Sequence, residues 1–160
     1  MGRRILILGI DPGLSGAIAL LSQEGNVLAI EDMPTVEIVV NGKKRRTVPP
    51  AALVALLKKM APQKAFLENV GVRPGEGAVG AFSFGRNRGQ IEGVLAALQI
   101  PTTLVHTATW KRRMNIPADK GGARLKAMAL FPDKVDLFKR VKDDGRAESA
   151  LLAYYGLSNA

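Results

Sequence analysis

The chain has 160 residues, a hydrophobic fraction of 47% and no cysteine, which excludes disulfides, zinc–thiolate sites and thiol nucleophiles. Its length suits one compact domain over residues 1–160. The 23 basic and 14 acidic residues give a formal net charge of +9, which favours a polyanionic partner, nucleic acid first, over a basic surface with no partner.

The first segments of the chain predict three antiparallel strands. Ile5–Asp11 is a short apolar run ended by Pro-Gly, and Gly16–Leu21 and Val27–Asp32 are the next two strand-like runs. Because parallel neighbours need a long crossover, strands that are joined this tightly pair in antiparallel fashion.

A basic hairpin is expected next. Val36–Val40 and Arg46–Val48 flank the segment Asn41-Gly42-Lys43-Lys44-Arg45, and Asn-Gly is a strong hairpin signal. The consecutive basic residues Lys43 to Arg46 are expected at the tip or just past it. A solvated loop and a direct DNA contact are equally good interpretations of this run.

The remaining segments alternate helices with strands. Pro49-Pro50 opens a helix that runs through Lys59, since proline is tolerated in a first helical turn. This α/β order predicts a mixed sheet, with three antiparallel strands and then parallel ones, flanked by helices on both faces. Further strands are expected at Lys64–Val70 and Thr102–His106, further helices at Ala81–Leu98, Thr109–Met114, Ala123–Leu130 and Arg146–Tyr155, and a glycine-rich loop at 71–80.

No targeting or membrane segment is expected. Gly2-Arg3-Arg4 precedes a short apolar run without a signal-peptide cleavage pattern, and no apolar run approaches the ~20 residues of a membrane span. We therefore expect a soluble, cytoplasmic protein with no membrane partner, in the host cytoplasm if the chain is phage-encoded.

Acidic residues follow or end two of the predicted buried strands. Asp11 ends the first strand, and a carboxylate in an apolar setting is unfavourable unless it is paired or coordinated. Glu68 lies near the carboxyl end of Lys64–Val70, on the same face as Phe66. That end of a strand points to the crevice where α/β sheets hold their ligands, although a solvated Glu68 is the alternative.

A third acidic group opens the last predicted helix. Asp144 and Glu148 are four residues apart and lie on one helical face if the helix begins this early, so their repulsion suggests a cation between them. Capping of the helix by Asp143 or Asp144 is the alternative. Capping explains Glu148 less well, because its neighbours in the predicted helix are apolar.

Four acids from separate segments can thus converge on one site. Hard oxygen ligands suit Mg²⁺, with Mn²⁺ able to substitute, and do not suit zinc. Paired divalent ions are a standard device for phosphodiester hydrolysis. An acidic cluster in a basic protein therefore predicts a nuclease.

Ordered motifs carry a family resemblance. They are Gly9-Ile10-Asp11-Pro12-Gly13-Leu14-Ser15-Gly16, Leu67-Glu68-Asn69-Val70, a glycine-containing helix from Phe82 to Gly93, Thr109-Trp110-Lys111, and Asp144 to Ala153. In this order they resemble the RuvC-type Holliday junction resolvases of the RNase H-like superfamily, and more narrowly the phage-type branch.

The resemblance implies metal-dependent nicking of two opposed strands of a four-way DNA junction by a homodimer, leaving a 5′-phosphate and a 3′-hydroxyl. It implies Asp11, Glu68 and Glu148 as metal ligands and catalytic residues. The last two acids of bacterial members are three apart, where this chain has Gly145. Asp144 is then the expected fourth ligand, with Asp143 as the fallback. The insertion at Val36–Val48 is a second departure.

Several basic residues are expected to contact DNA phosphates, which position DNA without reading its sequence. For each of them, the alternative is a solvated surface residue that does not contact DNA. Trp110 is expected in the core rather than stacked on a base, and His106 is not expected to be catalytic. The phosphate-contact candidates are Arg86, Arg88, Lys111, Arg112, Arg113 and Lys120.

Three other functions are weighed. An actin-like ATPase or sugar kinase needs two such domains, which 160 residues cannot supply. A non-catalytic DNA-binding module conflicts with four retained acids. A related nuclease that acts on other branched DNA or on RNA stays open, because specificity lies in loops and dimer geometry.

Overall fold

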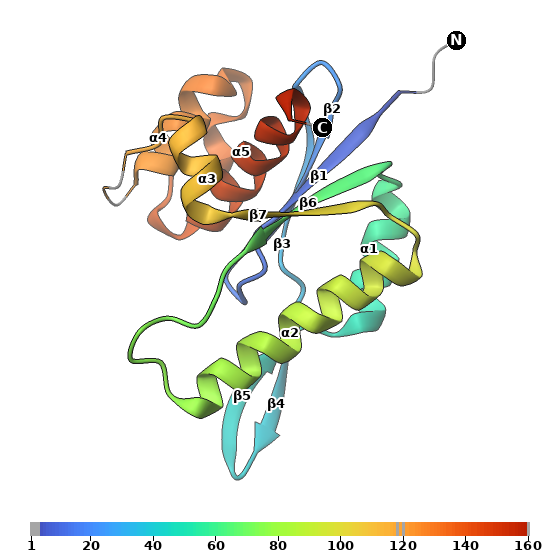
Figure 1. Cartoon of the computed structure of the whole chain (residues 1–160), viewed down its shortest axis with the longest axis vertical. Helices are drawn as coiled ribbons and strands as arrows, with labels where there is room; N and C mark the ends of the chain where they lie inside the picture. Colours follow the sequence, from blue (N-terminus) through green and yellow to red (C-terminus); the bar gives the residue numbers. More distant parts are fainter. Residues whose placement is uncertain (1–3, 118, 120, 160) are drawn as a thin grey trace.

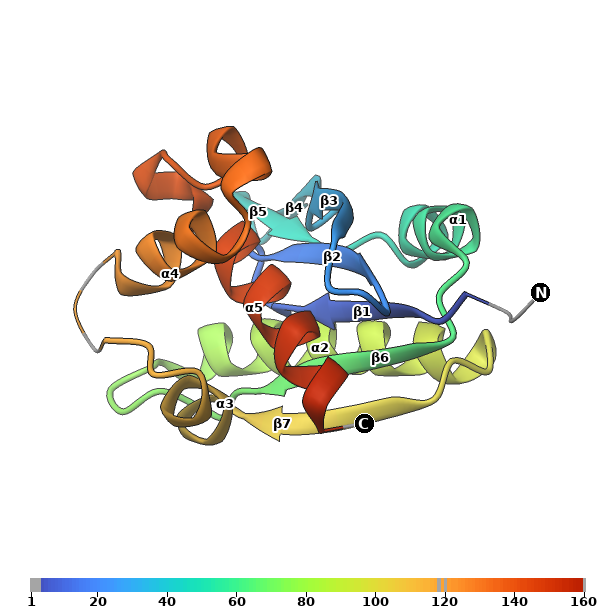
Figure 2. The same ribbon diagram turned by 90° about the horizontal axis from the view of Figure 1, so that it is seen from above.

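The sheet and its helices follow the predicted order. The computed structural model describes residues 4–117, 119 and 121–159 as a mixed β-sheet between two layers of helices (Figures 1 and 2). The five-stranded sheet has the order β3-β2-β1-β6-β7. β1, β2 and β3 pair in antiparallel fashion, while β6 and β7 run parallel to β1, so the expected topology is confirmed. The strands are β1 (Leu6–Ile10), β2 (Ala17–Ser22), β3 (Val27–Asp32), β6 (Lys64–Asn69) and β7 (Thr102–His106).

Each face of the sheet has its own apolar core. α1 (Pro50–Met60) and α2 (Ala78–Ala97) cover one face, and the carboxyl-terminal helices cover the other (Figure 1). Among the helices that the structure describes, none is both long and apolar enough to cross a bilayer. The second layer contains α3 (Thr107–Arg113), α4 (Gly122–Leu130), α5 (Asp144–Ser158) and the short 3₁₀ segments η1 (Pro132–Leu137) and η2 (Val141–Asp143).

The alternation of side chains along β6 determines on which face of the sheet Glu68 lies. Phe66 packs in the core beneath α5, and Leu67 packs in the core beneath α1 and α2. Because side chains alternate between the faces of a strand, Glu68 lies on the α5 side together with Phe66, as predicted.

The hairpin β4 (Val36–Val40) and β5 (Lys43–Thr47) forms a separate two-stranded sheet. The prediction that its second strand begins at Arg46 is wrong. Asn41 and Gly42 alone form the turn, with φ of 50° and 74°. Both central residues of a type I′ turn have positive φ, so strand pairing resumes at once. The four basic residues Lys43 to Arg46 therefore lie in β5, just past the tip, which is one of the two placements expected from the sequence.

Four helices begin earlier than predicted, α4 by the single residue Gly122. α2 begins at Ala78 instead of Ala81, because the Ala81 N–H donates to the Gly77 carbonyl at 3.0 Å and closes a first turn. α3 begins at Thr107, directly after β7, and α5 at Asp144. The early start of α5 places Asp144 and Glu148 in one helix, as their spacing suggested.

Two glycines let α5 lie directly on β1 and on the turn that follows it. A Cβ atom at Gly9 would overlap the Ser149 carbonyl oxygen and the Ala153 backbone nitrogen. A Cβ atom at Gly145 would meet the Ser15 carbonyl oxygen at 2.5 Å. This close approach brings the first two turns of α5 to the carboxyl end of β1.

Candidate active site

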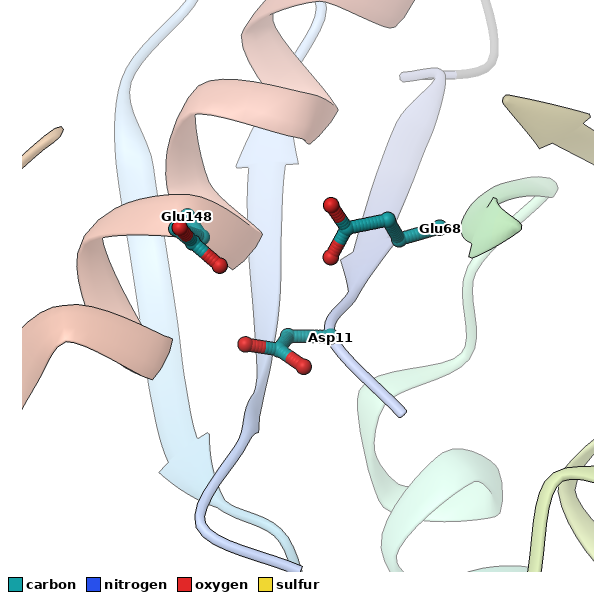
Figure 3. A group of neighbouring side chains, drawn as sticks. All are labelled: Asp11, Glu68 and Glu148. Carbon is teal, nitrogen blue, oxygen red and sulfur yellow. The ribbon is translucent and has the colours of Figure 1, made fainter. Parts of the chain in front are cut away.

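Three carboxylates meet at the carboxyl ends of β1 and β6. Asp11 directly follows β1, Glu68 is the next-to-last residue of β6, and Glu148 lies in the second turn of α5. One oxygen from each lies within 4.8 Å of the others. Their side chains point toward one another in Figure 3. These ends coincide because β1 and β6 are adjacent and parallel.

The triad has the electrostatic character of a cation site. Burial, followed by the charges of Glu68 and Glu148, raises the pKa of Asp11 from 3.8 to about 7. Burial is also the main cause that raises the pKa of Glu68, although hydrogen bonds from Thr107 and Trp110 oppose it. A set of hard oxygen donors that repel one another fits a divalent cation such as Mg²⁺ or Mn²⁺ and does not fit a soft metal.

The raised pKa predicts how stability depends on pH when no metal is present. The unfolded Asp11 loses its proton near pH 4 and the folded one near pH 7, so folded stability falls as pH rises through this window. In EDTA we expect Asp11→Asn to be more stable than the wild type by roughly 2–4 kcal/mol at pH 8 and nearly equal to it at pH 4. Thermal unfolding at both pH values measures this. A variant that is less stable than the wild type at pH 8 would contradict the burial of this charge.

Two donors hold Glu68 in place. Thr107 Oγ1 donates to Glu68 Oε1 at 2.6 Å, and the Trp110 indole N–H donates to the same oxygen at 3.3 Å. Trp110 is fully buried, so the expected core position is confirmed. The role of Thr107 was not predicted. No local sequence signal marks it, because it depends on the parallel pairing of β6 with β7, which sets His106 opposite Asn69 and so brings Thr107 to the end of β6.

Lys111 supplies positive charge inside the acidic cluster. Its Nζ donates to Glu148 Oε1 at 2.6 Å and lies 5.5 Å from the centre of the Trp110 ring. The sequence predicted a phosphate contact for Lys111. The structure places its ammonium group next to the carboxylates, where it balances part of their charge.

The turn after β1 orients Asp11. The Gly13 N–H donates to Asp11 Oδ1 at 3.1 Å, and the Asp11 N–H donates to the Ala17 carbonyl at 3.0 Å. The Gly16 N–H closes the turn on the Gly13 carbonyl at 2.9 Å. One oxygen of Asp11 is thus fixed to the backbone while the carboxylate faces the other two acids.

The two candidates for a fourth acid have different surroundings. Asp144 lines the same groove as Asp11 and Glu148, but its Oδ1 accepts from Arg124 Nε at 3.0 Å. Among the described residues it is not part of the three-carboxylate cluster. An acid at position 145, three before Glu148, has no room because a Cβ there overlaps the turn after β1.

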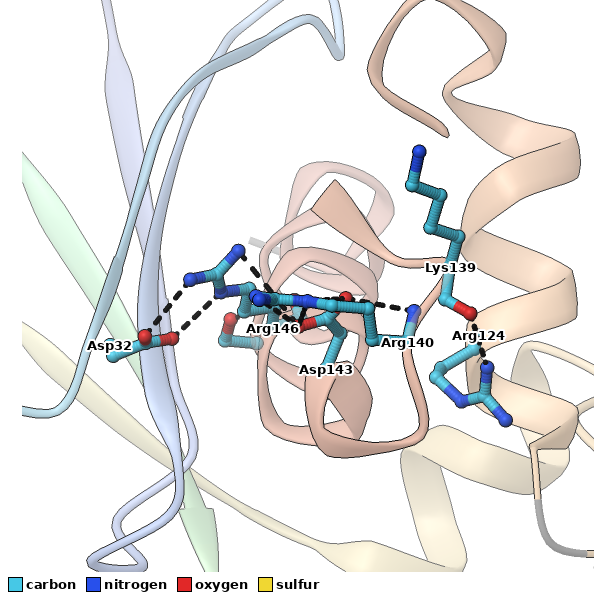
Figure 4. A network of polar contacts seen from close by, with 7 residues as sticks. Asp32, Arg124, Lys139, Arg140, Asp143 and Arg146 are labelled. Carbon is cyan, nitrogen blue, oxygen red and sulfur yellow. Dashed lines mark hydrogen bonds and ion pairs between the residues drawn. The ribbon is translucent and has the colours of Figure 1, made fainter. Parts of the chain in front are cut away.

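Asp143 faces away from the groove. Its side chain is 1% exposed, and it accepts hydrogen bonds from the backbone N–H and the guanidinium of Arg140, with Arg146 nearby (Figure 4). Burial opposes its charge, but the Arg140 hydrogen bonds hold the pKa of Asp143 below its ordinary value. Asp143 therefore accepts from the backbone at the start of η2 and makes no side-chain capping bond to α5, so it does not form the cap of the last helix that was the alternative from the sequence.

Two of the three clustered carboxylates, Asp11 and Glu148, line a groove of about 530 Å³. Asp11, Asp144 and Glu148 line one part of it. Arg45 of β5 and Arg73 of the β6–α2 loop add positive charge to its lining. Arg45 belongs to the basic run for which the sequence left a DNA contact open, and Arg73 was not predicted as a site residue. The lining of the groove therefore contains both acidic and basic residues.

The other expected phosphate contacts are spread over the surface. Arg86 on α2 and Arg112 and Arg113 at the end of α3 are exposed. Arg88 is engaged within the protein, since it pairs with Glu92 at 3.2 Å and donates to the Val70 carbonyl at 3.0 Å. Lys120 lies outside the described residues.

Comparison with known proteins identifies the fold. No protein-family model matches the sequence, and no curated protein matches it. RuvC of Thermus thermophilus, solved in complex with a Holliday junction substrate, matches with a TM-score of 0.62 and 15% identity, over 97% of this chain and 94% of that chain. A structure titled as that of Thermus thermophilus RuvC matches with a TM-score of 0.60 and 18% identity, over 97% of each chain.

A third solved structure extends the comparison to a eukaryotic protein. The yeast mitochondrial Holliday junction resolvase matches with a TM-score of 0.54 and 18% identity, over 94% of this chain and 77% of that chain. These matches show that the chain has the RuvC fold, so the fold that the sequence motifs predicted is confirmed.

Proposed function

We propose that this protein is a structure-selective endonuclease that resolves four-way DNA junctions by metal-dependent phosphodiester hydrolysis. The observation that carries the proposal is the convergence of Asp11, Glu68 and Glu148 at one edge of a RuvC fold. The net charge of +9 supports a polyanionic substrate. The matched RuvC structure that contains a Holliday junction substrate supports the choice of a branched one.

In this proposal Asp11, Glu68 and Glu148 hold Mg²⁺, for which Mn²⁺ substitutes. When bound, the ion polarises the phosphodiester and neutralises charge that develops during its hydrolysis. Thr107 and Trp110 hold Glu68 in the orientation needed for this, and Lys111 offsets the negative charge of the cluster. The products carry a 5′-phosphate and a 3′-hydroxyl.

The proposal includes a homodimer. A four-way junction presents two equivalent opposed strands, and two equivalent cuts need two equivalent sites related by a twofold axis. Each chain supplies one triad. Arg86, Arg112 and Arg113 are exposed and remain candidates for contacts to the junction arms.

Asp144 is the proposed fourth acid, and paired variants test this assignment. We expect Asp144→Asn to reduce cleavage by roughly 10–100-fold, equivalent to about 1.4–2.8 kcal/mol, with little change in thermal stability. Asp143→Asn removes buried, charge-assisted hydrogen bonds and lowers the free energy of unfolding by about 1–3 kcal/mol, while the folded variant still cuts. The reverse pattern would assign the role to Asp143.

A substrate panel tests the proposed function as a whole. The protein is incubated with a labelled four-way junction, a linear duplex, a flap and an RNA–DNA hybrid, each with Mg²⁺ or with EDTA. We expect cutting of the junction that requires Mg²⁺ and little cutting of the other substrates. Preferential cleavage of the flap or the hybrid would instead support a related nuclease with the same fold.

A further inference from the structure

The β4–β5 hairpin lies outside the main sheet and carries a dense run of positive charge. It extends away from the sheet beside α2 (Figure 1). Four consecutive residues of β5, Lys43 to Arg46, are basic and exposed. They account for 4 of the 23 basic residues of the chain. So much positive charge on one strand either binds a partner or is simply solvated. The position of the hairpin distinguishes between these two possibilities.

Asn87 anchors the base of the hairpin to α2. Its Oδ1 accepts from Thr47 Oγ1 at 2.9 Å and from the Val48 N–H at 3.0 Å, and its side chain is buried. An isolated two-stranded hairpin is only marginally stable in water, so this anchor fixes where β5 leaves the body of the protein. Arg45 lies two residues from Thr47, so its backbone lies close to this anchor while its side chain is exposed.

The register of the hairpin divides its basic residues between two faces. Lys43 pairs with Val40 and Arg45 with Ile38, so these two basic side chains share the face of Thr47. We call Lys43 and Arg45 the groove face, because Arg45 lines the groove that Asp11 and Glu148 also line.

The opposite face is engaged differently. Lys44 pairs with Glu37 at 3.2 Å and its side chain is 77% exposed, while Arg46 donates to Ser15 Oγ at 3.3 Å. Arg46 lines a separate pocket that does not include the triad. Of the four basic residues of β5, Arg45 is therefore the one that lines the acidic groove itself, while Arg46 contacts the turn after β1 at its border.

We propose that the groove face binds backbone phosphates of the DNA strand that runs from the acidic groove along the hairpin. Arg45 contacts the strand next to the carboxylates, and Lys43 contacts it about 7 Å farther out, which is the spacing of alternate residues in a strand. Acids alone would repel the DNA at this point, and Arg45 supplies an attractive contact at their edge. The inference rests on the proposed nuclease function and names the surface that guides the strand.

Salt-dependent binding distinguishes a phosphate contact from a general effect of charge. Affinity for a labelled four-way junction is measured in EDTA, where no strand is cut, at several salt concentrations. Each phosphate contact contributes about 0.9 to the slope of log K against log salt. We expect Lys43→Gln/Arg45→Gln to lower this slope by about 1.8 and to weaken binding by roughly 10-fold or more near 0.1 M salt.

Three variants serve as controls. Lys58→Gln/Lys59→Gln removes the same charge from the exposed end of α1, just before β6 begins and so at the far end of that strand from Glu68. Lys44→Gln removes charge from the opposite face of the same hairpin. Both are expected to leave the slope nearly unchanged. Lys43→Arg/Arg45→Lys keeps both charges and is expected to retain most of the wild-type slope.

Equal losses for the groove-face and α1 variants would overturn the proposal, since the charge would then act only through the overall field. An unchanged slope in Lys43→Gln/Arg45→Gln would overturn it as well. Neither result bears on the nuclease function, which is read from cutting by the wild type in Mg²⁺. If the wild type does not cut a junction, the proposed function fails whatever the hairpin binds.

Discussion

Asp11→Asn is expected to lower the rate of junction cleavage at least ~1000-fold while the protein still folds and binds the junction. Asp11 interacts with both other acids of the triad, because burial and then the charges of Glu68 and Glu148 raise its pKa. Loss of its charge removes a ligand from the proposed metal site, and such a site contributes several kcal/mol to catalysis. Each 1.4 kcal/mol of activation free energy changes the rate about 10-fold. Single-turnover cleavage in Mg²⁺ measures the rate, and a gel-shift assay in EDTA measures binding.

Asp133→Asn is the matched control for this variant, since Asp133 is an exposed acid of η1 outside the groove. It makes the same chemical change and should cut at the wild-type rate. Normal cleavage by Asp11→Asn would remove this residue from the catalytic site. Loss of junction binding together with cleavage would show that Asp11 acts on substrate affinity instead.

Gly9→Ala is expected to lower the free energy of unfolding by about 3 kcal/mol or more. The added Cβ overlaps the backbone of α5 at Ser149 and Ala153, and backbone atoms cannot move aside as a flexible side chain can. Displacement of α5 also moves Glu148 away from Asp11, so a folded variant should lose cleavage too. Chemical denaturation gives the stability, and the junction assay gives the activity.

Gly93→Ala provides the comparison. Gly93 is exposed in α2, and a Cβ there meets no atom within 4 Å. Alanine is favoured over glycine inside a helix, so this variant should gain roughly 0.5–1 kcal/mol. If Gly9→Ala were as stable as Gly93→Ala, α5 would not lie as close to β1 as the structure places it.

Two of the three clustered acids could be predicted from local patterns. Asp11 follows an apolar run and Glu68 lies near the end of another, and parallel strands bring such ends together. Glu148 was favoured by its apolar neighbours in the last helix. The different surroundings of Asp144 could not be predicted, because they depend on Arg124, which is 20 residues away in sequence.

Local sequence signals predicted only part of the β4–β5 hairpin. Asn-Gly predicted the turn, but the start of β5 depended on how few residues that turn uses. The position of Arg45 beside the groove depends on Asn87, whose bond to Val48 spans 39 residues of sequence. No periodicity or motif encodes such a contact. Thr107 was missed for the same reason, since its partner Glu68 is 39 residues away.

Cuts are mapped most directly in a four-way junction labelled on each strand in turn, in Mg²⁺ and in EDTA. We expect paired nicks in two opposed strands, with 5′-phosphate ends, only in Mg²⁺. Cutting that persists in EDTA, or a junction left intact in Mg²⁺ by folded protein, would contradict a metal-dependent resolvase built on Asp11, Glu68 and Glu148.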